Sequence, residues 1–576
     1  MFRLLRKAKR YTLVMAVVVV FLFIIAMCSL MLPRLMASLI DVGITQGDNS
    51  YIIKVGMQML GLSLISAICH IITNYFTAMS SMGFGRDLRS EVFEKITHFS
   101  LQQTDEFGTA ALITRTASDV RAMQTLLQAG LSSVVSVPLN MIGGIIMALS
   151  MDVQLASVVV IAMPVMLAII FINIKWVRPL FEAMRDKFDN VSRVLRENLS
   201  GVRVIRAFNT IDREHERFNK TNLEYTSANR QARHRMALIN PATTIVISSA
   251  TVAVYWFGQF RVLSGNMSVG DIMAFSQYVL QILGAVMGLQ MVFNMIPNAM
   301  AAAGRLNQVL DSEPLIIDPK EPLTPDEGIH GHIRFENVTF RYPGAEKPVL
   351  ENITFEALAG QTTAIIGGTG SGKSTIVSLI PRLYDIAEGA IYVDGVDVTQ
   401  MAQSDLRSRI GFVTQKAQLF TGSVADNIRF GNIGASEDDI TAAAQIAQAD
   451  SFIRDMGEGY SSFVSQDATN LSGGQKQRVS IARVVAKRPE IYIFDDSFSA
   501  VDFKTDAALR KALREITGSA AVIIVAQRVS TIMDAERIVV IDEGKIVGQG
   551  SHEELMKTCI IYREIVNSQM GGEEAA

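Results

Sequence analysis

The feature that most restricts the fold of this chain is a charge-free apolar run near its N-terminus. From Leu13 to Leu32 every residue is apolar or small, and four consecutive valines are followed by Phe-Leu-Phe-Ile-Ile. About 20 such residues are enough for a helix to cross a bilayer. Because backbone polar groups in lipid must bond within their own segment, we interpret this run as a transmembrane helix.

Five further stretches are long and apolar enough to cross a bilayer, and the second and sixth are weaker because they contain polar residues such as His70 and Gln281. The six predicted spans are approximately 13–36, 54–79, 125–150, 154–176, 239–261 and 269–297. The basic start, Met1–Arg10, resembles the beginning of a signal peptide. The apolar run behind it is too long for one, so we interpret Met1–Arg10 as an interfacial helix.

The distribution of charge predicts the orientation of these spans. Five basic residues lie in Met1–Arg10, whereas the loop Asp41–Ser50 has two acids and no base. The connections 80–124 and 177–238 are long and rich in Lys and Arg. Since basic loops stay on the cytoplasmic side, both chain ends are expected in the cytoplasm.

The second half of the chain contains a phosphate-binding loop, Gly367–Ser374, with the form G-x-x-x-x-G-K-S. It lies between an apolar stretch, 363–366, and a helix-like one, 375–380, which is the context that this motif requires. Glycines turn backbone N–H groups toward phosphate oxygens, while Lys373 reaches the β- and γ-phosphates and Ser374 ligates Mg²⁺. The predicted ATP contacts are Gly367, Gly368, Thr369, Gly370, Ser371, Gly372, Lys373, Ser374 and Thr375.

Two further motifs narrow the class of ATPase. Leu471-Ser-Gly-Gly-Gln475 follows the phosphate-binding loop by about a hundred residues. The apolar stretch 491–494 ends in Asp495, where the second Mg²⁺-coordinating group of such ATPases belongs. Together these motifs resemble those of the ATP-binding-cassette (ABC) family. The resemblance implies that Tyr342 stacks on adenine, that Gln415 senses Mg²⁺ and the attacking water, and that residues 499–502 connect two cassettes.

Almost the whole chain resembles a half-size bacterial ABC exporter. The resemblance implies a multidomain membrane protein, with a six-helix all-α transmembrane domain of the type IV exporter kind fused to an α/β P-loop ATPase domain. We predict a transmembrane domain at 1–310, a linker at 311–332 and a nucleotide-binding domain at 333–576. Turns near 107–111 and 198–202 resemble those that become coupling helices docking on the cassettes. Two chains are implied, because Ser472, Gly473, Gly474 and Gln475 face the ATP of the partner.

Two residues depart from the family pattern at the catalytic positions. Asp496 stands where the family has a glutamate general base, and Gln527 stands where it has a histidine that contacts the γ-phosphate. Losing one methylene withdraws the carboxylate by roughly an ångström, which can cost about a hundredfold in rate. An amide can donate a hydrogen bond but carries no positive charge. The segment 465–470 also lacks the usual Gly-Glu-Arg-Gly wording.

We interpret these departures as a degenerate ATP site in a heterodimer with a second, homologous half-transporter. Asp496 serving as an adequate base, or a homodimer with slow hydrolysis, are the alternatives. ATP and Mg²⁺ are the expected cofactors, and the expected ligands of the metal are Ser374, Gln415 and Asp495. The nearly balanced formal charge of −3 gives no reason to expect a nucleic-acid partner.

The substrate is expected to be a small hydrophobic or amphipathic compound of the multidrug type, exported across the bacterial plasma (inner) membrane. Flexible methionines in span six suit promiscuous apolar binding. Candidate cavity residues in that span are Met273, Phe275, Gln281, Met287, Gln290, Met291, Phe293, Asn294 and Met295. Rival functions are lipid or peptide export, import on the same fold, and a regulatory ATP-binding subunit, against which the six spans argue.

Overall fold

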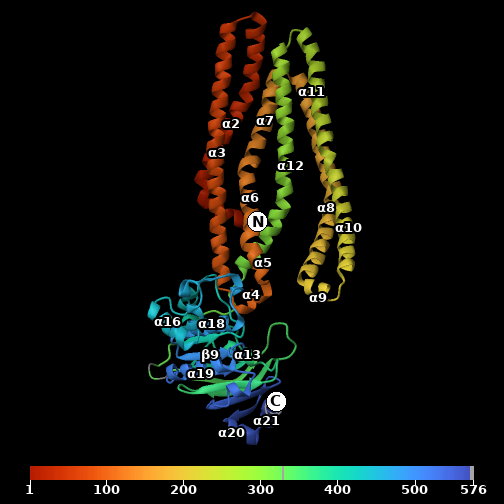
Figure 1. Ribbon diagram of the computed structural model, residues 1–576. Helices are drawn as coiled ribbons and strands as arrows, with labels where there is room; N and C mark the ends of the chain where they lie inside the picture. Colours follow the sequence, from red (N-terminus) through yellow and green to blue (C-terminus); the bar gives the residue numbers. More distant parts are fainter. Residues whose placement is uncertain (327, 329, 571–576) are drawn as a thin grey trace. The chain divides into compact units, whose positions relative to one another are not determined.

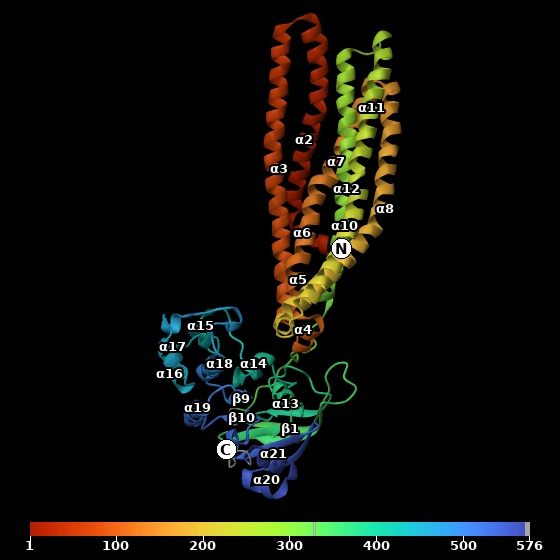
Figure 2. The ribbon, with the colours of Figure 1, turned by 45° about the vertical axis from the view of Figure 1, so that its right-hand side comes forward.

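The computed structural model describes residues 1–326, 328 and 330–570, and only the backbone of Leu289, Gln290, Met291, Phe293, Asn294 and Met570. The chain forms two compact units, which Figures 1 and 2 show from two directions. Unit 1 comprises Met1–Thr97 and Thr109–Ser312, and unit 2 comprises His98–Gly108 and the chain from Glu313 onward. Unit 1 is helical and unit 2 is α/β. Between Asp311 and Ile333, the described residues form no helix or strand.

Unit 1 contains six helical stretches that are long and apolar enough to cross a membrane, which confirms the six-helix transmembrane prediction. Several are interrupted by short π-helical turns (η2, η3, η4). The helices are α1 (Phe2–Arg6), η1 (Lys7–Tyr11), α2 (Thr12–Ser38), η2 (Leu39–Ile44), α3 (Asn49–Thr97), α5 (Thr109–Thr114), η3 (Arg115–Asp119), α6 (Val120–Ala129), η4 (Gly130–Val134), α7 (Val135–Met151), α8 (Val153–Ser200), α9 (Val202–Ala207), α10 (Ile211–Ala237), α11 (Ile239–Leu263) and α12 (Val269–Asp311).

The longest helices extend well beyond the thickness of a bilayer. Helix α3 has 49 residues and is therefore about 74 Å long, against a hydrocarbon core of about 30 Å. Helices α8 and α10 pack side by side and are joined at one end by the short helix α9, as both views show. Exposed ion pairs link these two arms, Lys187 to Glu224 at 2.6 Å and Arg217 to Glu197 at 2.7 Å.

The buried carboxylate of Asp152 links the start of α8 to the C-terminal end of α11 in unit 1. Asp152, between α7 and α8, accepts a hydrogen bond from the Leu155 backbone N–H and so caps α8. The other carboxylate oxygen accepts from Nε and Nη2 of Arg261 on α11, at 2.8 and 2.6 Å. The Asp152 side chain is only 4% exposed, so its charge depends on this arginine for compensation.

Unit 2 contains three sheets. Strands β1 (Ile333–Phe340), β2 (Leu350–Ala357), β4 (Glu388–Val393) and β5 (Val396–Asp397) form an antiparallel sheet in the order β2-β1-β4-β5. A six-stranded sheet has the order β12-β11-β3-β10-β9-β6, in which all neighbours are parallel except β12 and β11. Its strands are β3 (Thr362–Gly367), β6 (Ile410–Val413), β9 (Ile491–Asp495), β10 (Ala521–Val525), β11 (Arg537–Asp542) and β12 (Lys545–Gly550). Strands β7 (Gly422–Ser423) and β8 (Phe463–Val464) form a small third sheet.

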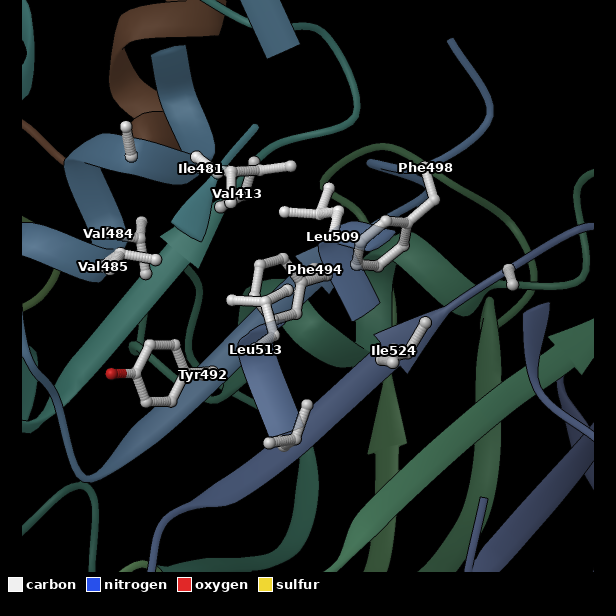
Figure 3. Close-up of a cluster of buried hydrophobic side chains, with 14 of the residues drawn as sticks. Val413, Ile481, Val484, Val485, Tyr492, Phe494, Phe498, Leu509, Leu513 and Ile524 are labelled. Carbon is white, nitrogen blue, oxygen red and sulfur yellow. The ribbon is translucent and has the colours of Figure 1, made fainter. Parts of the chain in front are cut away.

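The helices of unit 2 cover these sheets. They are α4 (Leu101–Phe107), α13 (Lys373–Leu379), α14 (Gln403–Arg409), α15 (Val424–Arg429), α16 (Glu437–Ile446), α17 (Asp450–Arg454), α18 (Gly473–Lys487), α19 (Phe503–Ile516), α20 (His552–Thr558) and α21 (Ile560–Met570), with three-residue 3-10 turns η5 (Gly459–Ser461), η6 (Gln466–Ala468) and η7 (Val529–Thr531). Figure 3 shows part of the core, where Phe494 of β9 lies among Phe498 and Leu509. All five residues of β9 are buried, as expected for a strand in the middle of a parallel sheet.

We expect Asp152→Asn to destabilise the transmembrane unit by about 1–3 kcal/mol, because Arg261 would lose its buried counter-charge. Asparagine caps a helix as well as aspartate does, so the cap on α8 is retained and the loss reports the ion pair. Thermal unfolding of the purified protein measures it. Glu182→Gln, which breaks the exposed Arg178–Glu182 pair, is the control and should change stability by less than about 0.5 kcal/mol. Equal losses of stability in the two variants would contradict a stabilising role for the Asp152–Arg261 ion pair.

Candidate nucleotide-binding site

The residues predicted to hold phosphate and magnesium and to act in catalysis lie at one edge of the six-stranded sheet. Strands β3, β6, β9 and β10 run parallel, so their carboxyl ends lie at the same edge. The phosphate-binding loop follows β3, and Asp495 ends β9. Gln415 comes two residues after β6, and Gln527 two residues after β10. Ligands of open α/β sheets bind at this edge, because loops leaving successive strands converge there.

The glycines of the loop are required by its backbone. Gly370 and Gly372 have φ angles of +83° and +98°, which side chains rarely adopt. A Cβ atom at Gly367 would lie 2.0 Å from the carbonyl oxygen of Ile541, so this position has no room for a side chain. The loop therefore keeps a conformation that brings its backbone close to an anion.

Lys373 points back into this loop. Its Nζ donates to the carbonyl oxygens of Gly367 at 2.9 Å and Gly368 at 2.6 Å. Burial lowers the pKa of Lys373, while the nearby Asp496 and Asp495 carboxylates act in the opposite direction. The Ser371 hydroxyl is buried and has no hydrogen-bond partner among the described residues. A cation that is costly to bury and an unsatisfied hydroxyl both suit a phosphate group.

Two of the three predicted magnesium ligands, Ser374 and Asp495, lie next to each other. The Ser374 hydroxyl donates to Oδ1 of Asp495 at 2.9 Å. Burial raises the pKa of Asp495, the neighbouring Asp496 raises it further, and the bond from Ser374 lowers it. A hydroxyl and a carboxylate are oxygen ligands of the kind that Mg²⁺ takes together with substrate phosphates, so these residues fit the metal. The third predicted ligand, Gln415, contacts Asp496.

Asp496 is held by two amide groups. Its Oδ2 accepts from Nε2 of Gln527 at 2.9 Å and from Nε2 of Gln415 at 3.4 Å. Burial raises the pKa of Asp496, whereas the Gln415 hydrogen bond lowers it. Its backbone is left-handed, with φ at +48°, a conformation that aspartate tolerates better than most residues. The three residues that the sequence placed in catalytic roles are therefore in direct contact.

A residue that the sequence analysis did not single out fixes Gln527. Gln569 of α21 donates from Nε2 to the backbone oxygen of Gln527 at 2.7 Å and accepts from the backbone N–H of Val529 at 2.8 Å. It thus bridges both ends of the turn that follows β10. No motif marks Gln569, because it lies 42 residues from its partner on a C-terminal helix.

Tyr342 lies beside the phosphate-binding loop. Its hydroxyl group is 3.1 Å from Oγ1 of Thr375, at the start of α13. Its ring makes edge contacts with Phe340 and Tyr384, with ring centroids 4.9 and 5.5 Å away. The ring is therefore fixed in orientation next to the loop, as an aromatic platform for a base requires.

The signature residues form the beginning of α18. Ser472 and Gln475 make a reciprocal capping box, in which each side chain bonds the backbone N–H of the other residue. This arrangement leaves the following glycines at a helix N-terminus, where backbone N–H groups and the helix dipole favour an anion. The preceding segment, 465–470, forms a turn held by the Asn470 side chain. Its oxygen accepts from the backbone N–H and the hydroxyl of Ser465, and its nitrogen donates to the Phe463 carbonyl.

The two turns predicted to couple the domains contain short helices but belong to different units. Helix α4, immediately before the first turn, is part of unit 2. There Gln103 donates to the Glu313 carbonyl at 2.8 Å and accepts from the Leu315 backbone N–H at 3.1 Å. Helix α9, after the second turn, is part of unit 1 and exposes apolar side chains, including Val204 at 60% and the adjacent Phe208 at 75%.

The predicted substrate residues on α12 have different surroundings. Phe275 is fully buried in the helix core, and Met287 packs against the same core. Met273 is 42% exposed, and the carbonyl oxygen of Gln281 is buried without a hydrogen-bond partner among the described residues. Met295 is half-buried. The side chains of Gln290, Met291, Phe293 and Asn294 lie outside the described residues.

The fold and this site define a P-loop ATPase unit joined to a six-helix membrane unit. Residues 15–286 match the ABC transporter transmembrane region, and residues 350–499 match the ABC transporter ATPase family. An uncharacterized ABC transporter ATP-binding protein of Mycobacterium tuberculosis is 41% identical over 97% of this chain and 96% of its own length. The chain therefore belongs to the ABC transporter family, as a half-size exporter with both domains fused.

Two other similar proteins are relevant to function and fold. A fatty acid ABC transporter ATP-binding/permease protein of Mycobacterium bovis is 34% identical over 84% of this chain and 76% of its own length. The solved structure of a bacterial Atm1-family ABC exporter with ATP bound is similar with a TM-score of 0.81 at 25% identity, over 97% of this chain and 98% of that chain. The predicted fold class is thus confirmed, and the protein is a multi-pass membrane exporter.

Replacing the Tyr342 ring should weaken ATP binding. Alanine removes a stacking surface worth about 1–3 kcal/mol per base, so we expect Tyr342→Ala to raise the Kd for ATP by roughly 5- to 150-fold. Tyr342→Phe keeps the ring and loses only the contact with Thr375, so it should change the Kd less than threefold. Titration with a fluorescent ATP analogue measures both. Equal losses in the two variants would show that the hydroxyl, and not the ring, contributes the binding.

Proposed function

We propose that this chain is one half of a heterodimeric exporter and that its own phosphate-binding loop forms an ATP site with slow hydrolysis. The observation that carries the proposal is the pair Asp496 and Gln527, which contact each other at the catalytic edge. Around this pair, Lys373, Ser374 and Asp495 retain the groups needed to hold ATP and Mg²⁺. A site that keeps its binding groups and alters its catalytic ones favours retention of nucleotide over turnover.

Two properties of Asp496 would slow hydrolysis: its side chain is short, and its carboxylate already accepts a hydrogen bond. The Asp496 side chain is one methylene shorter than glutamate, and its Oδ2 already accepts from the amide of Gln527. A general base must lie within hydrogen-bond distance of the water that it deprotonates, at about 2.6–3.2 Å. A shortened carboxylate whose oxygen is engaged by a neutral amide meets this condition poorly. The amide at 527 also brings no positive charge toward the γ-phosphate.

The signature of this chain is intact, which supports its use in a second site. Ser472 and Gln475 form a complete capping box at the N-terminus of α18, ready to contact an anion. In the composite arrangement that we propose, this end of α18 completes the competent ATP site of a partner chain. ATP held at the degenerate site keeps the two cassettes associated, while hydrolysis at the other site resets the transport cycle.

The short helices α4 and α9 transmit the movement of the cassettes to the membrane unit in this proposal. Helix α4 is bonded to its own unit 2 through Gln103. The apolar side chains exposed on α9 and at Phe208 suit docking on the cassette of the partner. Closing of the cassettes around ATP then biases the membrane units from an inward-facing to an outward-facing state, through the higher affinity of ATP for the closed form.

The proposed substrates are small hydrophobic or amphipathic compounds, exported across the plasma membrane with both chain ends in the cytoplasm. Exposed and half-buried methionines on α12, such as Met273 and Met287, support adaptable apolar contacts. The similarity to a fatty acid transporter favours lipid export as the second candidate. Uptake by inverted vesicles of an apolar cationic dye, in competition with a long-chain fatty acid, separates the two.

Restoring the family residues should restore catalysis at this site. With Asp496→Glu and Gln527→His together, we expect ATP hydrolysis by this chain's own site to rise about a hundredfold, because the base regains its reach. The measurement is single-turnover hydrolysis in the assembled transporter, with the partner's own site disabled. Asp496→Asn is the control, since it keeps the size of the side chain and removes the base. No increase in the double variant would contradict a degenerate site.

The partner itself is tested by the composition of the assembly. A tag on this chain should recover a second half-transporter in equal amount from native membranes. Recovery of a homodimer would contradict the heterodimer and leave a transporter with two slow sites.

We expect Phe208→Ala to weaken the coupling between substrate binding and ATP hydrolysis that we propose to run through α9. Burying a phenylalanine contributes about 1.5–3 kcal/mol, so losing this contact should reduce substrate-stimulated ATPase activity tenfold or more. Leu223→Ala is the control, because Leu223 is similarly exposed, at 69%, on the surface of α10. Unchanged stimulation in Phe208→Ala would exclude Phe208 from the docking surface.

A further inference from the structure

Helices α2 and α3 enclose an apolar groove on the membrane unit. The groove has a volume of about 400 Å³, within the range of small-molecule sites, and is open along one side. Helix α2 contributes Met31, Arg34 and Leu35 to its lining, and α3 contributes Gln58, Gly61, Leu62 and Ile65. The two helices pack side by side, as both ribbon views show. Its lining is therefore mostly apolar, with one charged side chain.

That charged side chain lies at the boundary of the hydrocarbon. Residues 13–33 contain no acid or base, so about 21 residues of helix, or about 31 Å, precede Arg34. This length is about the hydrocarbon thickness of a bilayer, which puts Arg34 at the level of lipid head groups on the side of the membrane where α2 and α3 are connected. Arg34 is exposed and makes no ion pair with any described residue.

A second positive charge lies on the same face of α3. Lys54, Gln58, Gly61, Leu62 and Ile65 follow the spacing of one helix face, and Lys54 is one turn nearer the connection. Lys54 is also exposed without an ion pair among the described residues. The nearby Asp41 is occupied elsewhere, since its carboxylate accepts from Ser268 and from the Gly270 backbone N–H at the start of α12. The other acid of the connection, Asp48, accepts from the Tyr51 backbone N–H, so Arg34 and Lys54 are, among the described residues, the basic side chains without an ion pair at this end of the groove.

We propose that this groove binds an anionic phospholipid of the surrounding bilayer. The phosphate lies on Arg34, with Lys54 adding attraction, and one acyl chain lies along Met31, Leu62 and Ile65. Arginine recognises phosphate through its planar fork of N–H donors, and an apolar channel leading from it into the hydrocarbon accepts a chain. The proposal goes beyond export and the ATP sites, and it rests neither on the heterodimer nor on slow hydrolysis.

Gly61 gives a direct way to fill the groove. A Cβ atom at Gly61 would meet no atom within 4 Å, and Gly61 lines the groove, so a large side chain there would project from the groove wall. Gly56 has equally open surroundings but lies on a different side of α3, about 140° around the helix from Gly61. Gly61→Trp and Gly56→Trp are therefore a matched pair, in which only the first obstructs the groove.

The test uses the full-length transporter in its native assembly, reconstituted in phosphatidylcholine vesicles. The probe is phosphatidylglycerol with a photoreactive diazirine in one acyl chain, and the same label on phosphatidylcholine is the reference. Cross-linked peptides are mapped by mass spectrometry. We expect the anionic probe to label peptides containing residues 31–35 or 58–65 at least fivefold more than the zwitterionic one. Arg34→Gln should abolish this preference and Arg34→Lys should keep most of it.

Gly61→Trp should lower labelling of these peptides by both probes at least fivefold, while Gly56→Trp should leave it unchanged. Equal labelling by the two probes, or a preference that survives Arg34→Gln, would overturn the proposal. Absence of labelling at this groove would mean that another protein surface covers it and would overturn the proposal too. Labelling that excess oleate removes and excess phosphatidylglycerol does not would assign the groove to free fatty acid instead.

Discussion

The structure depends on one constraint, that a backbone in lipid must satisfy its hydrogen bonds within its own segment. Continuous helices meet this constraint, and in this chain they continue far past the bilayer, as α3 does over 49 residues. A helix of this length carries a displacement at one end to the other without a hinge. The short helix α9 lies at the end of such an arm, between α8 and α10.

The ATP site follows a second constraint, the cost of burying charge. Burial lowers the pKa of Lys373 and raises the pKa values of Asp495 and Asp496, so each of these ions is destabilised by desolvation. Their mutual attraction offsets part of that cost. A phosphate on the lysine and a divalent cation on Asp495 offset more, because each supplies the opposite charge. The charges buried here therefore suit an anion beside Lys373 and a divalent cation beside Asp495.

Sequence and structure contribute different parts of this account. The spans and the phosphate-binding loop were predictable because apolar run length and glycine spacing are local properties, and Lys373 and Asp495 followed from them. The contact of Gln569 with Gln527 and the left-handed backbone of Asp496 were not predictable, since both depend on how distant strands and helices meet. Arg34 was overlooked for another reason. A single arginine at the end of a span is inconspicuous until the groove between α2 and α3 places it beside an open apolar channel.

The two catalytic departures are best understood as one unit. The amide of Gln527 donates to the Asp496 carboxylate at 2.9 Å, and residues in direct contact do not contribute independently to function. Lengthening residue 496 alone would push the carboxylate into the side-chain amide of Gln527, whose backbone is held by Gln569 on α21. Replacing Gln527 alone would leave a short base facing an imidazole. Either single change therefore leaves a mismatched pair, which is why the two positions have to be changed together when their contribution to hydrolysis is measured.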